Sequence, residues 1–153
     1  MRGELRHIAG VPATTAADSI FAACRALGLR RVTAISPYTE AVDAAEHRFF
    51  AEGGIETIAG AHLGITEGFR LAAPGPDAIL DLALRAWDQQ SDGLIAACLN
   101  FRSHQIIEAL GARIGKPVGH LDPGSALASA AARRRRYADP RLRPAVARAL
   151  TKS

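Results

Sequence analysis

The chain has 153 residues, of which 48% are hydrophobic and 22% charged, and its formal net charge is +4. That length allows one domain with a substantial hydrophobic core and is short for two. No run approaches the ~18 to 20 apolar residues that cross a bilayer, and residues 1–10 are too polar for a signal-peptide core, so we expect a cytoplasmic protein without a membrane partner.

A capping threonine and an apolar face at helical spacing predict a first helix. Thr14 or Thr15 would cap it, and Gly28 would end it. Its apolar face consists of Ile20, Phe21, Cys24 and Leu27. Because Cys24 is far from Cys98 and has no CxxC spacing, we expect two reduced thiols rather than a disulfide.

Residues 31–36 predict a buried strand, which is followed by a second helix. That helix would begin at Thr39, carry Glu40 in its first turn and close at residues 53–54. Its expected buried side chains are Val42, Ala45 and Phe49. Residues 55–59 predict the next strand.

Residues 60–75 show no clear period, and their glycines and prolines predict a long loop that could border a site. A third helix is expected from Pro76, which suits a first helical position, with Asp77 at the positive end of the helix dipole. The apolar residues that repeat at helical spacing are Leu80, Ala83, Leu84 and Trp87. Residues 94–97 predict a further strand.

A fourth helix is expected to begin near His104, and residues 116–118 would lead into a fourth strand. The residues that this helix would bury are Ile106, Ile107 and Leu110. Helices and strands therefore alternate along the chain. This alternation predicts the α/β class, with a parallel sheet, helices on both faces and right-handed crossovers.

Two predicted strand ends carry candidate functional side chains, at residues 36–38 and 98–100. In open α/β sheets, ligands bind at the carboxyl ends of the strands. Cys98 would stand at a strand-to-helix corner, where free backbone N–H groups and the helix dipole favour a thiolate and an anionic ligand. We therefore expect the function to be organised around Cys98.

Several strings in consistent order resemble the maleate isomerase and arylmalonate decarboxylase family, which belongs to the aspartate/glutamate racemase superfamily. They are Gly10-Val11-Pro12, Thr14-Thr15, Ala26-Leu27-Gly28, Arg30-Arg31-Val32, Ser36-Pro37-Tyr38, Leu63-Gly64-Ile65-Thr66, Cys98-Leu99-Asn100-Phe101-Arg102 and Gly115-Lys116-Pro117-Val118. Together they span about two thirds of the chain, which makes the resemblance more specific than any single motif. The resemblance is to the second half of the family's sequence.

The resemblance implies one flavodoxin-like or Rossmann-like lobe of a two-lobe fold, whose active site lies between the lobes. Members act on small dicarboxylates or malonates without a cofactor or metal. By resemblance, Cys98 supplies or removes a proton at the substrate carbon, Tyr38 donates to a substrate carboxylate, and the Leu99 N–H is an oxyanion donor. Pro37 and Asn100 complete the implied substrate-binding set.

The implied chemistry suits these residue types. Reaction at a carbon beside a carboxylate generates an enediolate, which needs fixed N–H or O–H donors and a nearby acid or base. A thiol can be that acid or base, so no metal is required. The resemblance thus implies a cofactor-independent isomerase, racemase or decarboxylase, such as a maleate cis-trans isomerase-like or arylmalonate decarboxylase-like protein.

The sequence also departs from the family pattern. Leu99 stands where threonine is common, and Gly111 where glutamate is common. The first lobe and its cysteine do not precede Gly10, and Cys24 cannot replace that cysteine because it lies on an apolar helix face. We therefore expect a truncated protein of doubtful activity on its own, whose exposed inter-lobe face favours a homo-oligomer.

After Val118 the resemblance stops. If residues 119–127 and 139–144 are back-translated with GC-rich codons and read one nucleotide later, the new translation contains strings like those of the family. Our hypothesis is that residues 1–118 form the α/β lobe and residues 119–153 a divergent, frameshifted, arginine-rich tail, irregular or helical. The run of arginines at residues 133–136 could attract nucleic acid, but a solvated tail is the favoured interpretation, and no nucleic-acid partner is expected.

Each candidate also has a purely structural interpretation. Cys98 could be a small core residue, Tyr38 could cap its strand end, and Asn100 could be a turn residue. The five histidines show no metal-ligand spacing. Two function classes therefore stay open: an enzyme lobe that acts through Cys98, and a non-catalytic α/β remnant or binding module with a basic tail.

Overall fold

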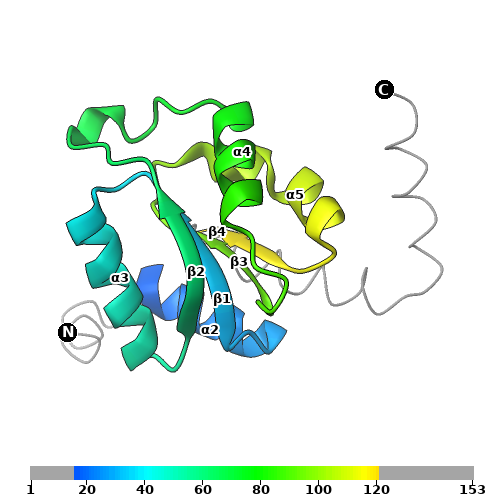
Figure 1. Ribbon diagram of the computed structural model, residues 1–153. Helices are drawn as coiled ribbons and strands as arrows, with labels where there is room; N and C mark the ends of the chain where they lie inside the picture. The colour runs from blue at the N-terminus through cyan, green and yellow to red at the C-terminus, as the bar shows by residue number, and fades with distance from the viewer. Residues whose placement is uncertain (1–15, 121–153) are drawn as a thin grey trace, which may run out of the picture.

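A computed structural model describes residues 16–120, and these form a four-stranded sheet with helices around it (Figure 1). The elements in chain order are α2 (Ala16–Leu27), β1 (Arg31–Ser36), α3 (Glu40–Glu52), β2 (Glu56–His62), η1 (Gly68–Arg70), α4 (Pro76–Ala86), β3 (Gly93–Ala96), η2 (Arg102–Gln105), α5 (Ile107–Ile114) and β4 (Val118–His120). The strand order is β2-β1-β3-β4, and each neighbouring pair is parallel. The predicted α/β class with a parallel sheet is confirmed.

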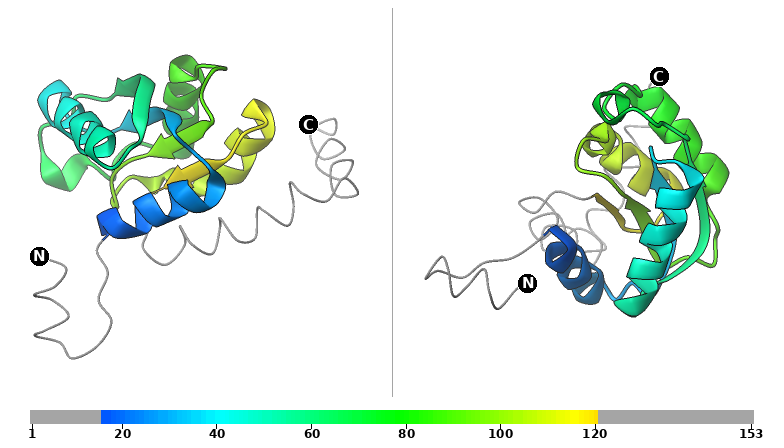
Figure 2. Two further views of the ribbon diagram at one scale, coloured as in Figure 1. Left: turned by 90° about the horizontal axis from the view of Figure 1, so that it is seen from below. Right: turned by 90° about the vertical axis from the view of Figure 1, so that its left-hand side faces the viewer.

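Side chains that alternate along the strands build one apolar cluster on each face of the sheet. Val32 of β1 and Ile95 of β3 belong to the cluster that α2 and α3 cover. Ile35 and Leu94 belong to the other cluster, which α4, η2 and α5 cover. Figures 1 and 2 show the sheet between these helix pairs, so the prediction of helices on both faces is confirmed.

Local signals at the helix ends work as the sequence predicts. Pro76 occupies the start of α4, with Asp77 in the first turn. Gly28 follows α2 and Gly115 ends α5, both with positive φ values, of 72° and 66°. A left-handed residue of this kind stops a helix, and glycine adopts it without strain.

The buried face of α3 differs from our prediction. Val42, Ala45 and Phe49 are exposed, whereas Asp43 and Phe50 are buried. The ring of Phe50 lies at 90° to that of Phe21 on α2, with 6.5 Å between centroids. The Ser36 hydroxyl at the end of β1 donates a hydrogen bond of 2.5 Å to the Asp43 carboxylate. The helix therefore turns a carboxylate and one aromatic ring towards the sheet.

Other element boundaries, and the buried face of α4, also differ from our predictions. β2 continues to His62, beyond the predicted end at residue 59, because each added residue pairs with β1 up to Ser36. A 3-10 helix, η2, precedes α5, so α5 itself begins at Ile107 and not near His104. On α4, Ile79, Leu82 and Ala83 are buried, whereas three predicted core residues are only partly buried. These three are Leu80, Leu84 and Trp87.

Some predictions concern residues outside the described part. These are the capping by Thr14 or Thr15 and the nature of the tail after His120. β4 runs two residues past Val118, the predicted end of the lobe, and the division of the chain stays a prediction. Among residues 16–120, no helix has the length and apolar character that a membrane crossing requires.

Candidate functional site

The candidate site lies where β1 and β3 end side by side (Figure 1). Ile35 is in register with Ala96, and the Ala97 N–H donates to the Ile35 carbonyl at 2.8 Å, which extends the ladder by one residue. The next residues on the two strands, Pro37 with Tyr38 and Cys98, therefore leave the same edge of the sheet. The structure brings these three predicted site residues together.

Cys98 has a strained backbone. Its φ is +104°, and within residues 16–120 no other non-glycine residue has a positive φ. For a residue with a side chain, such a conformation costs roughly 1–3 kcal/mol and persists only where the surrounding structure holds it. Its side chain is 4% exposed, and its carbonyl accepts the N–H of Phe101 at 3.2 Å in the turn that leads to η2.

The side chain of Tyr38 packs against the buried cluster that contains Cys98. Burial of the phenol, followed by its interaction with the Cys98 thiol, raises the pKa of Tyr38 above its usual range. The hydroxyl therefore stays protonated at neutral pH and can donate a hydrogen bond. A phenol O–H that donates to a sulfur stabilises the negative charge of a thiolate.

Backbone contacts hold Tyr38 in place. Its N–H donates to the Ser36 hydroxyl at 3.4 Å, and its carbonyl accepts the N–H of Gly64 at 2.9 Å. The Ile65 N–H donates to the Pro37 carbonyl at 3.0 Å. The predicted loop after β2 is thus fixed to the end of β1 and borders the site.

A polar cluster lies behind this edge, between α3 and the sheet. Asp43 accepts the Ser36 hydroxyl through Oδ1, and its Oδ2 lies 3.3 Å from Nε2 of His47. That histidine contact lacks the alignment of a hydrogen bond. A Cβ on Gly60 of β2 would lie 3.2 Å from Cε1 of His47, so the glycine leaves room for the ring.

Glu46, one turn after Asp43, is a further acid on α3. Its Oε2 is buried and has no hydrogen-bond partner among the described residues. Burial, with a smaller contribution from the Asp43 carboxylate, raises the pKa of Glu46 to about 7. We did not predict either acid from the sequence, because a polar contact between a strand end and the following helix leaves no apolar period.

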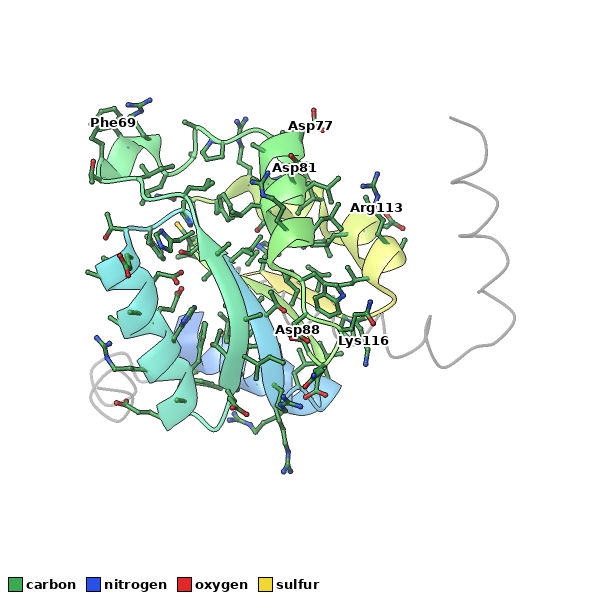
Figure 3. All side chains as sticks on the ribbon, in the orientation of Figure 1. Phe69, Asp77, Asp81, Asp88, Arg113 and Lys116 are labelled. Atoms are coloured by element: carbon green, nitrogen blue, oxygen red, sulfur yellow. The ribbon has the colours of Figure 1, made fainter. Side chains whose placement is uncertain are left out.

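The remaining predicted site residues lie at the surface. Leu99 is 59% exposed and Asn100 is also exposed, so neither side chain is enclosed with the buried side chain of Cys98. Arg102 donates to the carbonyls of Ala73 and Pro74 at 3.3 Å each, which connects η2 to the segment before α4. Phe69 on η1, labelled in Figure 3, is 85% exposed.

Cys24 behaves as the sequence analysis expects. It is buried in the cluster between α2 and the sheet, and burial raises the pKa of its thiol to about 11. A thiol of this kind is inert at neutral pH. Within residues 16–120, no group of three or more histidine, cysteine or acidic side chains is arranged to hold a metal ion.

Comparisons with known proteins point to one family. The family model described as arylmalonate decarboxylase matches residues 1–141. The arylmalonate decarboxylase of Bordetella bronchiseptica is 30% identical over 121 residues, which cover 78% of this chain and 50% of that protein. The match extends past Val118, and this chain spans about half the length of that relative.

Solved structures agree with the sequence comparisons. A crystal structure of arylmalonate decarboxylase superposes with a TM-score of 0.72 at 29% identity, covering 82% of this chain and 57% of that one. The maleate isomerase Iso from Pseudomonas putida S16 superposes with a TM-score of 0.70 at 25% identity, covering 80% of this chain and 48% of that one. Both relatives share the α/β fold described above.

Proposed function

This chain belongs to the arylmalonate decarboxylase family, and we propose that it provides the cysteine-bearing half of a cofactor-independent decarboxylase or isomerase site for small dicarboxylates. The observation that carries this proposal is that Tyr38 and Cys98 leave the ends of adjacent parallel strands together, with Tyr38 packed against the buried cluster that contains Cys98. The strained φ of Cys98 supports it, because such strain gathers at functional sites.

The proposed chemistry is a proton transfer. In a decarboxylation, the bond from the α-carbon to one carboxylate breaks, CO2 leaves, and the electron pair stays on the α-carbon as an enediolate. The Cys98 thiol then gives its proton to that carbon and becomes a thiolate, which the Tyr38 O–H stabilises. Protonation of the thiolate by water restores the site.

Each of the other proposed site residues has a part in this step. The backbone N–H of Leu99 would donate to an enediolate oxygen, and Pro37 would close the apolar side of the site as a buried residue. Asn100 is an exposed polar group on the same turn, where it would meet a second carboxylate. An isomerisation would use the same thiol as acid or base.

A further part of this proposal is self-association. The exposed side chains of Leu99 and Phe69 follow β3 and β2 respectively, on the segments that leave the same edge of the parallel sheet. A second copy would cover this edge and supply further donors around the substrate. Light scattering of the purified chain checks this: a dimer is expected, and a monomer at micromolar concentration contradicts it.

Turnover of an arylmalonate and of maleate by the full chain tests the enzyme proposal. We expect activity that disappears in Cys98→Ala and persists in Cys24→Ala, because Cys24 is a core thiol away from the site. Equal turnover in the wild type and Cys98→Ala would contradict the role of Cys98. No turnover of either substrate by the wild type favours the non-catalytic alternative.

A further inference from the structure

α3 turns a carboxylate, and not an apolar side chain, towards the end of β1. Asp43 is 5% exposed and lies in the first turn of the helix. The Ser36 hydroxyl donates to its Oδ1 at 2.5 Å, and Nε2 of His47 lies 3.3 Å from its Oδ2. Burial of a carboxylate is costly unless such contacts replace the lost water. The proposed reaction uses neither Asp43 nor Ser36, so their bond needs another explanation.

We propose that Asp43 is a positioning residue, which acts through Ser36 to hold the turn at residues 36–38 and thereby keeps Tyr38 at the candidate site. This inference rests on the proposed function, because it concerns how Tyr38 is held at the same edge of the sheet as Cys98. Its first test measures backbone hydrogen exchange and needs no turnover, so the two proposals can fail independently.

The loop after β2 holds the carbonyl groups of this turn. The carbonyls of Ser36, Pro37 and Tyr38 each accept an N–H group from residues 63–65, at distances between 2.9 and 3.1 Å. These bonds fix one side of the turn. The N–H groups of the turn need partners of their own.

The N–H side of the turn depends on the Ser36 hydroxyl. Pro37 has no N–H, and the N–H of Tyr38 donates to the Ser36 hydroxyl oxygen at 3.4 Å. That hydroxyl donates its own proton to Asp43. Because a hydroxyl that donates to a carboxylate becomes a better acceptor, Asp43 strengthens the contact with Tyr38. Two hydrogen bonds in series therefore connect α3 to the Tyr38 backbone.

The helix fixes Asp43 in turn. Its N–H donates to the Thr39 carbonyl at 2.9 Å, and the positive end of the helix dipole favours a negative charge in this first turn. Ser36 is 1% exposed, so bulk water cannot replace Asp43 as the acceptor of its hydroxyl proton. Without Asp43, the Ser36 hydroxyl loses its acceptor and can rotate away from the Tyr38 N–H.

A purely structural role and a positioning role predict different patterns of amide exchange. If the bond only stabilised the fold, its loss would speed the exchange of protected amides throughout the sheet and helices. The positioning role predicts a local effect at the turn and at the loop bonded to it. The reporter amides for this effect are those of Tyr38, Gly64 and Ile65.

Amide hydrogen exchange of the isotope-labelled full chain, followed by NMR, tests for the local effect. The reference amide is that of Leu110, a buried residue whose N–H donates at 2.8 Å within α5. In Asp43→Ala and in Ser36→Ala, we expect the reporter amides to exchange at least about tenfold faster relative to that reference. The double variant should exchange no faster than either single variant, because both changes break the same bond.

Two further variants separate the positioning role from stability. Ser91→Ala is the matched control, because Ser91 is also a buried serine, and its Oγ lies 2.9 Å from Oγ1 of Thr33. Its loss should leave the reporter amides unchanged relative to Leu110. Asp43→Asn keeps the shape and an acceptor oxygen, so its reporter amides should exchange at rates closer to the wild type than those of Asp43→Ala. If Asp43→Ala does not fold, Ser36→Ala carries the test, because it removes the same bond.

Turnover of an arylmalonate gives a second readout. kcat/KM should fall by about 10-fold to 100-fold in Ser36→Ala and stay within about threefold of the wild type in Ser91→Ala, because a misplaced Tyr38 no longer meets the reacting groups. An inactive wild type bears on the proposed function alone, since hydrogen exchange decides the positioning role without it.

Several results would overturn the inference. They are reporter amides that keep pace with Leu110 in Ser36→Ala, a double variant in which they exchange about tenfold faster than in either single variant, and Asp43→Asn amides as fast as those of Asp43→Ala. An unchanged kcat/KM in Ser36→Ala would do the same.

Discussion

Tyr38 and Cys98 leave the carboxyl ends of β1 and β3 side by side, and the Tyr38 side chain packs against the buried cluster that contains Cys98. These two residues are far apart in sequence, and the parallel pairing of Ile35 with Ala96 brings them together. The thiol thus stands on a strained backbone, beside a phenol, at one edge of the sheet.

The positive φ of Cys98 predicts an unusual order of stabilities. Cys98→Gly should unfold at a higher urea concentration than Cys98→Ala, because glycine adopts φ +104° without strain and alanine does not. We expect a difference of about 1 kcal/mol in the free energy of unfolding. An alanine variant at least as stable as the glycine variant would contradict the strain at this position.

Removal of the phenol oxygen should make the Cys98 thiolate harder to form. In Tyr38→Phe, we expect alkylation of Cys98 by iodoacetamide at about pH 8.5 to slow by roughly threefold to tenfold, because a hydrogen bond from the phenol to the thiolate would contribute about 1.5–3 kcal/mol and part of that is regained from water. Mass spectrometry of the tryptic peptide of residues 86–102, which contains Cys98, measures the alkylation rate. Unchanged reactivity in a folded variant would show that the phenol does not act on the thiol.

Glu46 should make the stability of the protein depend on pH. The pKa of Glu46 is about 7 in the folded state, above the ~4.3 of an unfolded chain. The contribution of Glu46 to the free energy of unfolding is therefore fully present below about pH 4.3 and is lost as pH rises through about 7.

Urea unfolding at a series of pH values checks this. Between those two pKa values, the free energy of unfolding of the wild type should fall relative to Glu46→Gln, by at most about 1.4 kcal/mol per pH unit. Parallel stability curves for the two proteins would be inconsistent with a raised pKa at Glu46.

Gly93 at the start of β3 has no room for a side chain. A Cβ there would lie 2.6 Å from the Pro117 carbonyl oxygen and 3.1 Å from a methyl group of Leu29. Gly93→Ala should therefore destabilise the protein by roughly 1–3 kcal/mol, as overpacked positions do. Gly68→Ala is the matched control, because its Cβ would meet nothing within 4 Å. Equal unfolding midpoints for these two variants would count against the close approach of β3 to Pro117.

The sequence predicted the helix stops and the end of β1 well, because those signals are local. Gly28 and Gly115 end their helices through their own backbone conformation, and Pro76 begins one. β1 ends at Ser36 as its short apolar run predicts, whereas β3 ends at Ala96, one residue before its predicted end, and β2 runs beyond its predicted end. The adjacency of β1 and β3 follows from the parallel pairing that the α/β alternation predicts.

The buried face of α3 could not be predicted from apolar periodicity. That criterion selects Val42 and Phe49, but the side chain that the sheet accepts is Asp43, because Ser36 provides its hydrogen bond. A polar contact between a strand end and the next helix leaves no periodic signal. The extension of β2 to His62 was missed for a similar reason. Pairing with β1 extends the strand, although Gly60 has a weak strand propensity.

The most direct test of the role of Cys98 compares the activity of the chain with the alkylated fraction of the Cys98 thiol. The full chain is alkylated to increasing extents, and turnover of an arylmalonate is measured beside the modified fraction of the Cys98 peptide, residues 86–102. We predict that activity falls in proportion to that fraction and reaches zero when Cys98 is fully modified, while Cys24 stays unmodified in the core. Activity that survives complete alkylation of Cys98 would contradict the account.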